Sequence, residues 1–291
     1  MNLSKTELEA KLSRAKAILC GLGKVGVSFS GGVDSTLLLK LAVEACGREN
    51  VLALTGLSPT LPARELVAAR AMAQRLGVEH LEVEVNDLDD PAFRGNPPDR
   101  CYHCKRRRLR ALRRAAAARG IGQLVEGTNL DDLADYRPGL RASGEAGVRS
   151  PLLEAGLGKT EIRELSRQLG LEGWDRPAAA CLASRIPYGL EITAARLKQV
   201  ERAEDFLAGL GFSPVRVRHH GDVARIEVAP GERARLLERG AEVVATLEGL
   251  GFRFVALDLA GYRTGSLNRA LDRTVADAAG AAHPSGDGRE F

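Results

Sequence analysis

The sequence has few aromatic residues, little net charge and no long apolar run. Aromatic residues make up 4% of the 291 residues, and the formal net charge is +4. So small a positive excess argues against a nucleic-acid platform, although it suits an anionic substrate of nucleotide size. No apolar run approaches the about 18 residues of a transmembrane helix, and residues 1–7 lack the apolar core of a signal peptide. We therefore predict a cytoplasmic protein with no membrane span and no stable nucleic-acid partner.

Disulfide bonds are not expected either, because the cytoplasm keeps thiols reduced. The five cysteines are Cys20, Cys46, Cys101, Cys104 and Cys181. Cys20 and Cys46 lie in apolar helical contexts, where a cysteine behaves as a small core residue. The other three lie in polar surroundings and are the candidates for chemistry.

What the sequence does contain is a regular alternation of short apolar strands with helices. Strands are expected at residues 25–30, 51–55, 80–85 and 122–128, with helices between them. This pattern predicts an α/β fold with a parallel sheet, whose ligands bind at the carboxyl ends of the strands. A boundary near residues 186–193 divides the chain into a larger domain (1–188) and a smaller α+β domain (189–276), which contains predicted helices at 193–210 and 231–249. The tail (277–291) is rich in Ala, Gly and Ser, and we expect it to be disordered.

The most informative stretch follows the first strand. Ser30-Gly31-Gly32-Val33-Asp34-Ser35 stands between an apolar strand, which ends with Ser28, and an apolar helix. Two glycines let the backbone approach a ligand, and their N–H groups, the serine hydroxyls and the helix N-terminus form a cradle for pyrophosphate. Asp34 is a poor phosphate ligand, so we expect it to hold the loop or a Mg²⁺ ion. The six residues together match the motif of the PP-loop ATP pyrophosphatases; the alternative is an ordinary strand–turn–helix.

A second group of candidates lies at the end of the fourth strand. Gly127 and Thr128 are expected beside the glycine loop, and Asp131 and Asp132 follow directly as residues that order the loop or position Mg²⁺. Lys159 opens a helix and is a candidate phosphate ligand. The Gly-Lys-Thr sequence around it is not a Walker A loop, because Leu153 stands where that motif needs glycine. The predicted ATP-binding residues are Ser28, Ser30, Gly31, Gly32, Asp34, Ser35, Gly127, Thr128, Asp132 and Lys159.

Three cysteines form the candidate sulfur site. Cys101 and Cys104 are spaced as a CxxC pair at the start of a basic helix, which on its own fits a redox pair, half a zinc site or chance. Cys181 lies near Arg185, whose charge favours the thiolate. Three thiolates without a fourth partner suit an iron–sulfur cluster with one open iron. Zinc stays open as an alternative, with His103, His219 or His220 as its fourth ligand.

Two charged surfaces are also predicted. The basic face of the helix at 105–119 is interpreted as solvated rather than as an interface. In the smaller domain, two strands around residues 219–222 alternate with period two. Their apolar side chains face the core and their charged ones share the other face: Arg216, Arg218, Arg225 and Glu227.

Taken together, the motifs resemble those of the LarE family. They are residues 30–35, residues 127–132, Cys181-Leu182-Ala183-Ser184-Arg185 and Tyr262-Arg263-Thr264-Gly265-Ser266. The resemblance covers nearly the whole chain. It implies an adenine nucleotide alpha hydrolase-like fold and an ATP-dependent sulfurtransferase of nickel-pincer cofactor biosynthesis. Such an enzyme adenylates a carboxylate of pyridinium-3,5-biscarboxylic acid mononucleotide and then replaces AMP with sulfur.

The resemblance also assigns roles to residues. It implies Cys181 as the catalytic cysteine, Ser184 and Arg185 as its supporting residues, and Arg216, Glu227 and Arg263 as the substrate-phosphate and metal site. Single-cysteine members sacrifice the sulfur of the residue that matches Cys181. Members with three cysteines carry a [4Fe-4S] cluster instead, and the presence of Cys101 and Cys104 favours this second type. ATP, Mg²⁺, a sulfide donor and a homo-oligomer, with a hexamer favoured, complete the expectation.

Two rival functions stay open at this point. A cluster-dependent tRNA thiolase uses the same loop and cysteines, but the low net charge and the lack of a separate RNA-binding domain speak against it. An amidotransferase or a ligase similar to NAD synthetase needs an ammonia source and leaves the three cysteines unexplained.

Overall fold

The described residues of this chain form two separate sheets. We describe it from a computed structural model that covers residues 5–134, 137–177 and 180–263. The larger part contains α1 (Lys5–Leu22), β1 (Val25–Ser28), α2 (Val33–Cys46), β2 (Val51–Leu57), α3 (Ala63–Leu76), β3 (Glu79–Glu84), α4 (Pro91–Arg94), α5 (Arg100–Ala117), β4 (Gln123–Glu126), α6 (Gly139–Glu145), α7 (Pro151–Glu154) and α8 (Lys159–Gln168). The smaller part contains α9 (Ala194–Gly209), β5 (Val215–His220), β6 (Val223–Val228), α10 (Arg233–Glu238), α11 (Gly240–Gly249) and β7 (Phe254–Leu257).

The larger sheet is parallel and has the strand order β3-β2-β1-β4. The chain builds outward from β1 to β3 and then returns to the other side of β1 with β4. The direction of winding therefore reverses between β1 and β4, and a crevice opens at their carboxyl ends. The glycine loop and Gly127 follow these two strands, so the topology places both at the reversal point, as predicted.

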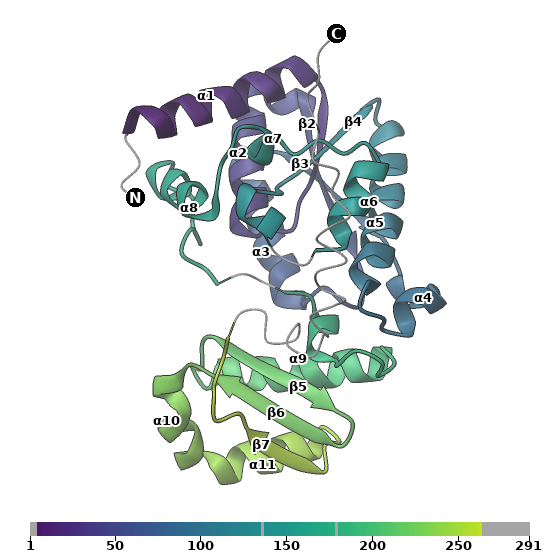
Figure 1. Ribbon diagram of the computed structural model, residues 1–291, viewed down its shortest axis with the longest axis vertical. Helices are drawn as coiled ribbons and strands as arrows, with labels where there is room; N and C mark the ends of the chain where they lie inside the picture. The colour runs from purple at the N-terminus through teal and green to yellow at the C-terminus, as the bar shows by residue number, and fades with distance from the viewer. Residues whose placement is uncertain (1–4, 135–136, 178–179, 264–291) are drawn as a thin grey trace.

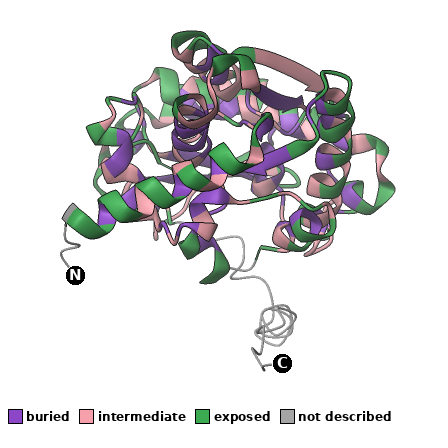
Figure 2. Ribbon diagram, turned by 90° about the horizontal axis from the view of Figure 1, so that it is seen from above, coloured by how far each residue is buried: buried purple, intermediate pink, exposed green. Residues whose placement is uncertain are grey.

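Helices cover both faces of this sheet. On one face, α1, α2, α3 and α8 contribute to an apolar core with the side chains of Val25, Val27 and Ala53. On the other face, α5 packs Leu109 and Leu112 against Leu52 and Leu54, and α6 lies outside α5 (Figure 1). The alternate residues of β2 thus face opposite layers, as strand geometry requires. Figure 2 shows the buried residues in the interior and the exposed outer surface of α1, the helix nearest to the N-terminus.

The smaller sheet has the order β5-β6-β7, with β6 antiparallel to β5 and parallel to β7. Its apolar face packs on α9 and α11 through Leu207, Val243 and Leu247. The register pairs Arg216 with Glu227 and Arg218 with Arg225, so the predicted charged face is confirmed. This face is not solvated, however: Arg216, Arg218 and Glu227 are all buried. Arg218 of this face donates to the carbonyl of Ser184, and β5 is the strand of this sheet that lies nearest to the larger part of the molecule (Figure 1).

The structure corrects several predicted boundaries. The first strand ends at Ser28 instead of residue 30, because the chain turns into the glycine loop there. The helix predicted at 231–249 is broken at Gly240 into α10 and α11, because the chain changes direction after Arg239. Helix α3 ends at Gly77, which has the left-handed φ of 65° that glycine permits at a helix end.

The division of the chain at residue 188 stays a prediction. Each sheet has its own core, which agrees with two domains, but a third apolar cluster joins Leu182, Ala183 and Ile186 to Ile192 and Leu197 across that position. Among the described residues, no helix combines the length and the apolar character that crossing a membrane requires. The tail predicted to be disordered, 277–291, lies outside the described residues.

Candidate active site

The glycine loop is held in shape by its own serine side chains. The backbone N–H of Ser30 donates to Ser35 Oγ (3.3 Å), and Ser35 Oγ donates to the carbonyl of Gly32 (3.1 Å). Gly31 has a φ of 74°, and a Cβ at this position would lie 3.1 Å from the backbone of Ala69 in α3. Only glycine therefore fits here. The loop is pre-shaped, and it exposes backbone N–H groups at the N-terminus of α2, the arrangement that binds phosphate.

The end of β4 comes close to the same helix. A Cβ on Gly127 would lie 2.9 Å from the backbone nitrogen of Ser35, so glycine permits this approach. Thr128 Oγ1 donates to Glu126 (2.8 Å), and Asp132 accepts a backbone N–H of its own loop (3.1 Å). In the described structure, Thr128 and Asp132 therefore shape the segment after β4.

Lys159 and Asp34 form an ion pair beside the glycine loop. Lys159 Nζ lies 2.7 Å from Oδ1 and 2.5 Å from Oδ2 of Asp34. The backbone N–H of Lys159, at the start of α8, donates to the carboxylate of Asp131. Asp131 thus holds the beginning of the helix, and Asp34 holds the lysine side chain. A role for Asp34 in Mg²⁺ binding stays a prediction.

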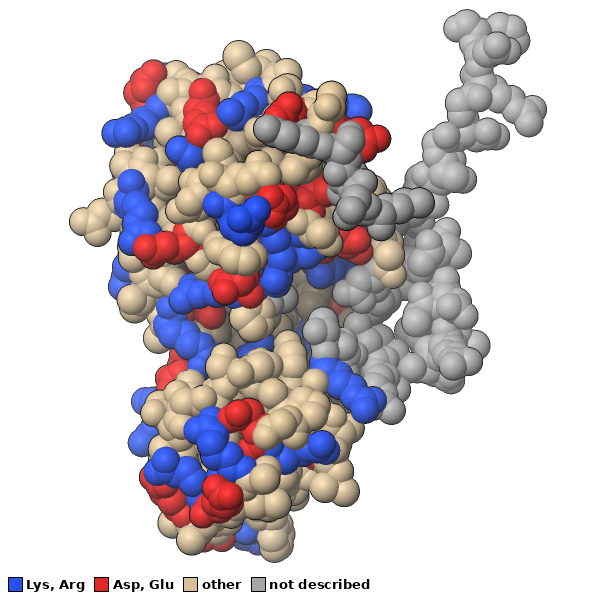
Figure 3. All heavy atoms as spheres, turned by 90° about the vertical axis from the view of Figure 1, so that its left-hand side faces the viewer, with Lys and Arg blue, Asp and Glu red and all other residues tan. Residues whose placement is uncertain are grey.

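A cavity connects this loop with Cys181. Its volume is about 530 Å³, and it lies between the glycine loop and the smaller sheet. Figure 3 shows a hollow between the upper and lower parts of the molecule, with Lys and Arg side chains along its edge. The predicted site residues that line the cavity are Ser30, Gly31, Gly32, Asp34, Lys159, Cys181, Arg185 and Arg216. The predicted residues outside its lining are Ser28, Ser35, Cys101, Cys104, Gly127, Thr128, Asp132, Ser184, Glu227 and Arg263.

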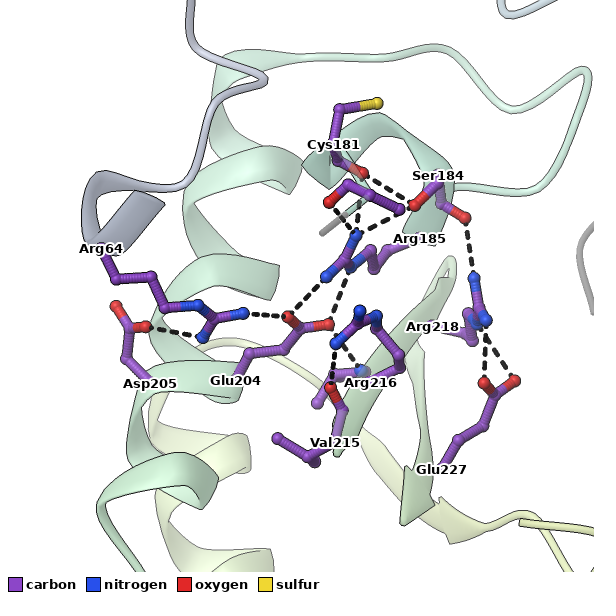
Figure 4. A network of polar contacts seen from close by, with 12 residues as sticks. Arg64, Cys181, Ser184, Arg185, Glu204, Asp205, Val215, Arg216, Arg218 and Glu227 are labelled. Atoms are coloured by element: carbon purple, nitrogen blue, oxygen red, sulfur yellow. Dashed lines mark hydrogen bonds and ion pairs between the residues drawn. The ribbon is translucent and has the colours of Figure 1, made fainter. Parts of the chain in front are cut away.

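The loop that carries Cys181 is anchored by Arg185. The guanidinium of Arg185 donates from Nη1 to the carbonyls of Ala180 (2.6 Å) and Cys181 (2.9 Å) and to Ser184 Oγ (3.0 Å). Ser184 Oγ in turn donates to the carbonyl of Cys181 (2.7 Å). Figure 4 shows that Sγ of Cys181 points away from this network. In the described structure, then, Arg185 holds the backbone of the cysteine loop, and its charge also interacts with Cys181, as the sequence suggested.

A buried glutamate in α9 completes the anchor. Glu204 is fully buried and accepts from Nε (2.8 Å) and Nη2 (2.9 Å) of Arg185 and from the backbone N–H of Val217 (3.1 Å). It also accepts from Arg64 of α3 (3.1 Å), so one carboxylate joins the two parts of the molecule (Figure 4). Burial alone would raise the pKa of Glu204, but the hydrogen bonds and charge of Arg185 outweigh burial and lower the pKa.

Two of the three predicted substrate-phosphate residues, Arg216 and Glu227, lie on the buried face of the hairpin. Arg218 forms a two-pronged ion pair with Glu227 (3.0 and 2.8 Å) and donates to the carbonyl of Ser184 (2.9 Å). Arg216 lines the cavity and lies 5.3 Å from the ring centre of Tyr262. Burial, and then the neighbouring Arg185, lower the pKa of Arg216. Arg263 is exposed, and residues 264–266 of its motif lie outside the described residues.

The three candidate cysteines share one neighbourhood. Cys101 and Cys104 lie in the first two turns of α5. Desolvation by the surrounding protein raises the pKa of both thiols, and the charges that the other sulfur atoms would carry, Cys181 included, raise it further. Yet within residues 5–134, 137–177 and 180–263, no three His, Cys, Asp or Glu side chains lie close enough together to hold a metal ion. His219 instead packs on Phe252 and contacts Gln199 (3.0 Å), and His103 pairs with Asp99 (3.4 Å).

Several residues of the site were not predicted. Glu204 was missed because its partner, Arg185, is 19 positions away in the sequence. Arg64 and Arg176 line the cavity from segments that carry no motif. Arg108 also lines it and donates from Nη2 to Sγ of Cys104 (3.4 Å). The i, i+4 spacing of Arg108 and Cys104 on a helix was the available signal for that contact.

Known proteins are similar to this chain over two different lengths. A family model described as NAD synthase matches residues 8–177. An uncharacterized protein of Synechocystis sp. is 43% identical over 268 residues, which are 91% of this chain and 100% of that protein. The pyridinium-3,5-bisthiocarboxylic acid mononucleotide synthase of Lactiplantibacillus plantarum is 40% identical over 266 residues, which are 91% of this chain and 96% of the synthase. An NH₃-dependent NAD⁺ synthetase of Chlorobaculum tepidum is 34% identical over 56% of this chain and 59% of its own length.

The shorter and the longer similarity cover different sides of the cavity: the glycine loop lines one side, and Cys181 and the smaller sheet line the other. The NAD synthase model ends before Cys181, and therefore covers the glycine loop but not Glu204 or the smaller sheet. The similarity to the L. plantarum synthase is long enough to extend into that second side.

Proposed function

Since the chain belongs to the LarE family of PP-loop ATP-dependent sulfurtransferases, we propose that it acts on pyridinium-3,5-biscarboxylic acid mononucleotide. The proposed reaction adenylates one carboxylate of this substrate and replaces the AMP with sulfur to give a thiocarboxylate. The observation that carries the proposal is the cavity of about 530 Å³ in which the glycine loop and Cys181 meet. An enzyme that joins ATP cleavage to sulfur transfer needs both groups in one space, because the acyl adenylate must not escape to water.

The first half-reaction uses the glycine-loop side of the cavity. An oxygen of the substrate carboxylate attacks the α-phosphorus of ATP, and the bond to pyrophosphate breaks. The N–H groups of the loop are suited to the leaving pyrophosphate, because they present positive charge without reorganising. Nζ of Lys159, which is paired with Asp34, would exchange this carboxylate for the phosphate. We expect Mg²⁺ to accompany ATP, with Asp34 as its candidate ligand.

The second half-reaction uses the Cys181 side. The sulfur atom attacks the acyl carbon, the bond from that carbon to the phosphate oxygen breaks, and AMP leaves. Adenylation is needed because a free carboxylate has no good leaving oxygen. We propose Arg216, Glu227 and Arg263 as the site for the substrate phosphate; the position of Arg216 on the cavity supports this.

The source of the sulfur is the finer part of the proposal. We propose that Cys101, Cys104 and Cys181 hold a [4Fe-4S] cluster, which when bound offers an iron atom to an external sulfide. The electrostatic influence of the three sulfur atoms on one another supports this donor set. The described side chains are not close enough to ligate a metal as they stand, so no step above depends on the cluster. The alternative is loss of the Cys181 sulfur itself, with dehydroalanine left behind.

One experiment tests the reaction and its sulfur source together. The protein is purified without oxygen, and its iron, labile sulfide and mass are measured before and after one turnover with ATP, Mg²⁺, the biscarboxylic mononucleotide and sodium sulfide. We expect pyrophosphate, AMP and thiocarboxylate in equal amounts, with iron present and the protein mass unchanged. A mass loss of about 34 Da, the mass of H₂S, on Cys181 would show that the sulfur comes from the cysteine itself and not from the cluster. Absence of pyrophosphate release would contradict the whole proposal.

The oligomeric state is a separate proposal. We propose a homo-oligomer, because Phe254 of the edge strand β7 and the nearby Leu259 are exposed at 64% and 81% and such apolar side chains at a sheet edge favour association. Light scattering of the purified chain distinguishes a hexamer from a monomer.

A further inference from the structure

Arg108 occupies an unusual position among the cations of α5. Its side chain crosses Gly56 of β2, where a Cβ would lie 3.0 Å from Cγ and 3.4 Å from Nε of the arginine. A glycine in the strand therefore lets the arginine stem lie flat on the sheet and reach the cavity. The guanidinium reaches the same cavity as Cys181 and Lys159.

The hydrogen bonds of Arg108 are incomplete. Its Nη2 donates to Sγ of Cys104 (3.4 Å), while its Nε is buried and has no hydrogen-bond partner among the described residues. Other cations of the same helix have carboxylate partners: Lys105 pairs with Glu126 (2.9 Å) and Arg107 with Asp89 (3.1 Å). A buried N–H without an acceptor costs free energy, so the position favours a bound anion.

Arg108 lies among the side chains of three cysteines and one buried carboxylate. Cys104, Cys181 and Cys101 all interact electrostatically with its guanidinium. The carboxylate that also interacts with it, Asp87, is fully buried and accepts from Ser58 (2.6 Å) and from Cys104 (3.5 Å). No carboxylate of the described part of the chain forms an ion pair with Arg108. The guanidinium thus contacts the sulfur of Cys104 and shares its cavity with Cys181, without a carboxylate paired to it.

We propose that Arg108 binds the anionic sulfur that is transferred, a hydrosulfide ion in the free state, and holds it beside Cys181 for attack on the acyl adenylate. This inference rests on the proposed function. A guanidinium is weakly hydrated and suits a large, polarisable anion better than an ammonium group does. In the step, the carbon–sulfur bond forms, the bond from the acyl carbon to the phosphate oxygen breaks with its electron pair leaving on AMP, and the S–H proton goes to water. The phosphate groups of ATP are left to the glycine loop and Lys159.

The first test separates the two half-reactions. In Arg108→Met, the proposal expects pyrophosphate release from ATP and substrate within about twofold of wild type, while the KM for sodium sulfide in thiocarboxylate formation rises at least about tenfold, the usual effect of losing a charged hydrogen bond. Arg108→Lys keeps the charge and should recover part of the loss. Arg110→Met is the matched control, since Arg110 is an exposed arginine of α5 outside the cavity; it should behave as wild type.

The second test does not depend on activity. Crystals of the anaerobically purified protein are soaked in bromide, a soft anion that scatters X-rays anomalously. We expect a peak in hydrogen-bonding contact with Arg108 that disappears in Arg108→Met. An unchanged sulfide KM, or a peak that persists without Arg108, overturns the inference while pyrophosphate release stays intact. If Arg108→Met fails to fold, Arg108→Lys takes its place in the test. The inference is then overturned if the KM for sulfide of Arg108→Lys equals that of wild type and neither wild type nor Arg108→Lys shows a bromide peak. Loss of pyrophosphate release in the wild type instead overturns the proposed function.

Discussion

The glycine loop and the Cys181 loop face the same cavity but are held in different ways. Ser30–Ser35 are stabilised by hydrogen bonds among neighbours in the sequence, and the loop presents backbone N–H groups. The Cys181 loop is held by Arg185, whose partner Glu204 lies in another helix. One loop is a local structure, and the other depends on the folding of the whole chain.

This difference separates what each loop contributes. A local backbone cradle recognises phosphate in many proteins, so the glycine loop indicates ATP use and little else. The Cys181 loop is joined to the smaller sheet through Glu204 and Arg218. These contacts fix the Cys181 loop and the smaller sheet relative to one another. This side of the cavity distinguishes the enzyme from NAD synthetases, because the NAD synthase family model stops at residue 177.

The sharpest way to separate the two loops is Cys181→Ser. We expect thiocarboxylate formation to fall by about 10³-fold or more, because a serine hydroxyl replaces neither a thiolate ligand of the proposed cluster nor, in the alternative, the sulfur that Cys181 would give up. The rate of pyrophosphate release in the first turnover should stay within about twofold of wild type, because Cys181 takes no part in the first half-reaction. Mass spectrometry of the product and a pyrophosphate assay measure the two values. An equal fall in both would show that the two sides of the cavity are not independent.

Glu204→Gln tests whether the Cys181 loop depends on its distant partner. Removing the carboxylate leaves the buried Arg185 without its counter-charge, and we expect a loss of about 3–5 kcal/mol in the free energy of unfolding. Urea unfolding followed by circular dichroism measures it. The control is Asp205→Asn. Asp205 lies on the same helix as Glu204 and forms an exposed ion pair with Arg64 of α3, so its loss should cost at most about 1 kcal/mol. Similar losses in both variants would contradict a special role for Glu204.

Lys159→Met tests the phosphate side. The rate of pyrophosphate release should fall about 100-fold, because the charge beside the glycine loop is lost at the leaving pyrophosphate. Lys11→Met is the control. Lys11, in α1, pairs with Glu161 (2.6 Å), which is on the same helix as Lys159, but Lys11 does not line the cavity. Stability should change little in either variant. Pyrophosphate release that is unaffected in Lys159→Met would remove this residue from the ATP site.

The pH dependence of stability gives the smallest effect. Glu204 has a pKa below its ordinary value of 4.5 in the folded protein. Its stabilising contribution is therefore complete above about pH 4.5 and is lost as the pH falls through the lower, folded-state pKa. The slope from this one group is at most about 1.4 kcal/mol per pH unit. Urea midpoints measured from pH 6 to pH 3 should fall less steeply in Glu204→Gln than in wild type; parallel curves would contradict the assignment.

By itself, the sequence determined the larger sheet, the glycine loop and the charged face of the hairpin. Each of these follows from neighbouring residues: period-two alternation, a Gly-Gly pair after an apolar strand, or a glycine at a helix end. The motifs around Cys181 also determined the family. These features were predictable because backbone geometry and short-range periodicity produce them.

The tertiary structure alone decided how the charges of the site are paired. Arg185 interacts electrostatically with Cys181, as expected, but its hydrogen bonds go to backbone carbonyls and to Glu204, which the sequence did not indicate. The charged face of the hairpin was recognised, yet its burial was not. The place of Arg108 in the site depends on the packing of α5 on β2, where Gly56 leaves room for the arginine stem. Such pairings join residues from distant segments, and a buried charge finds its partner in space rather than in the sequence.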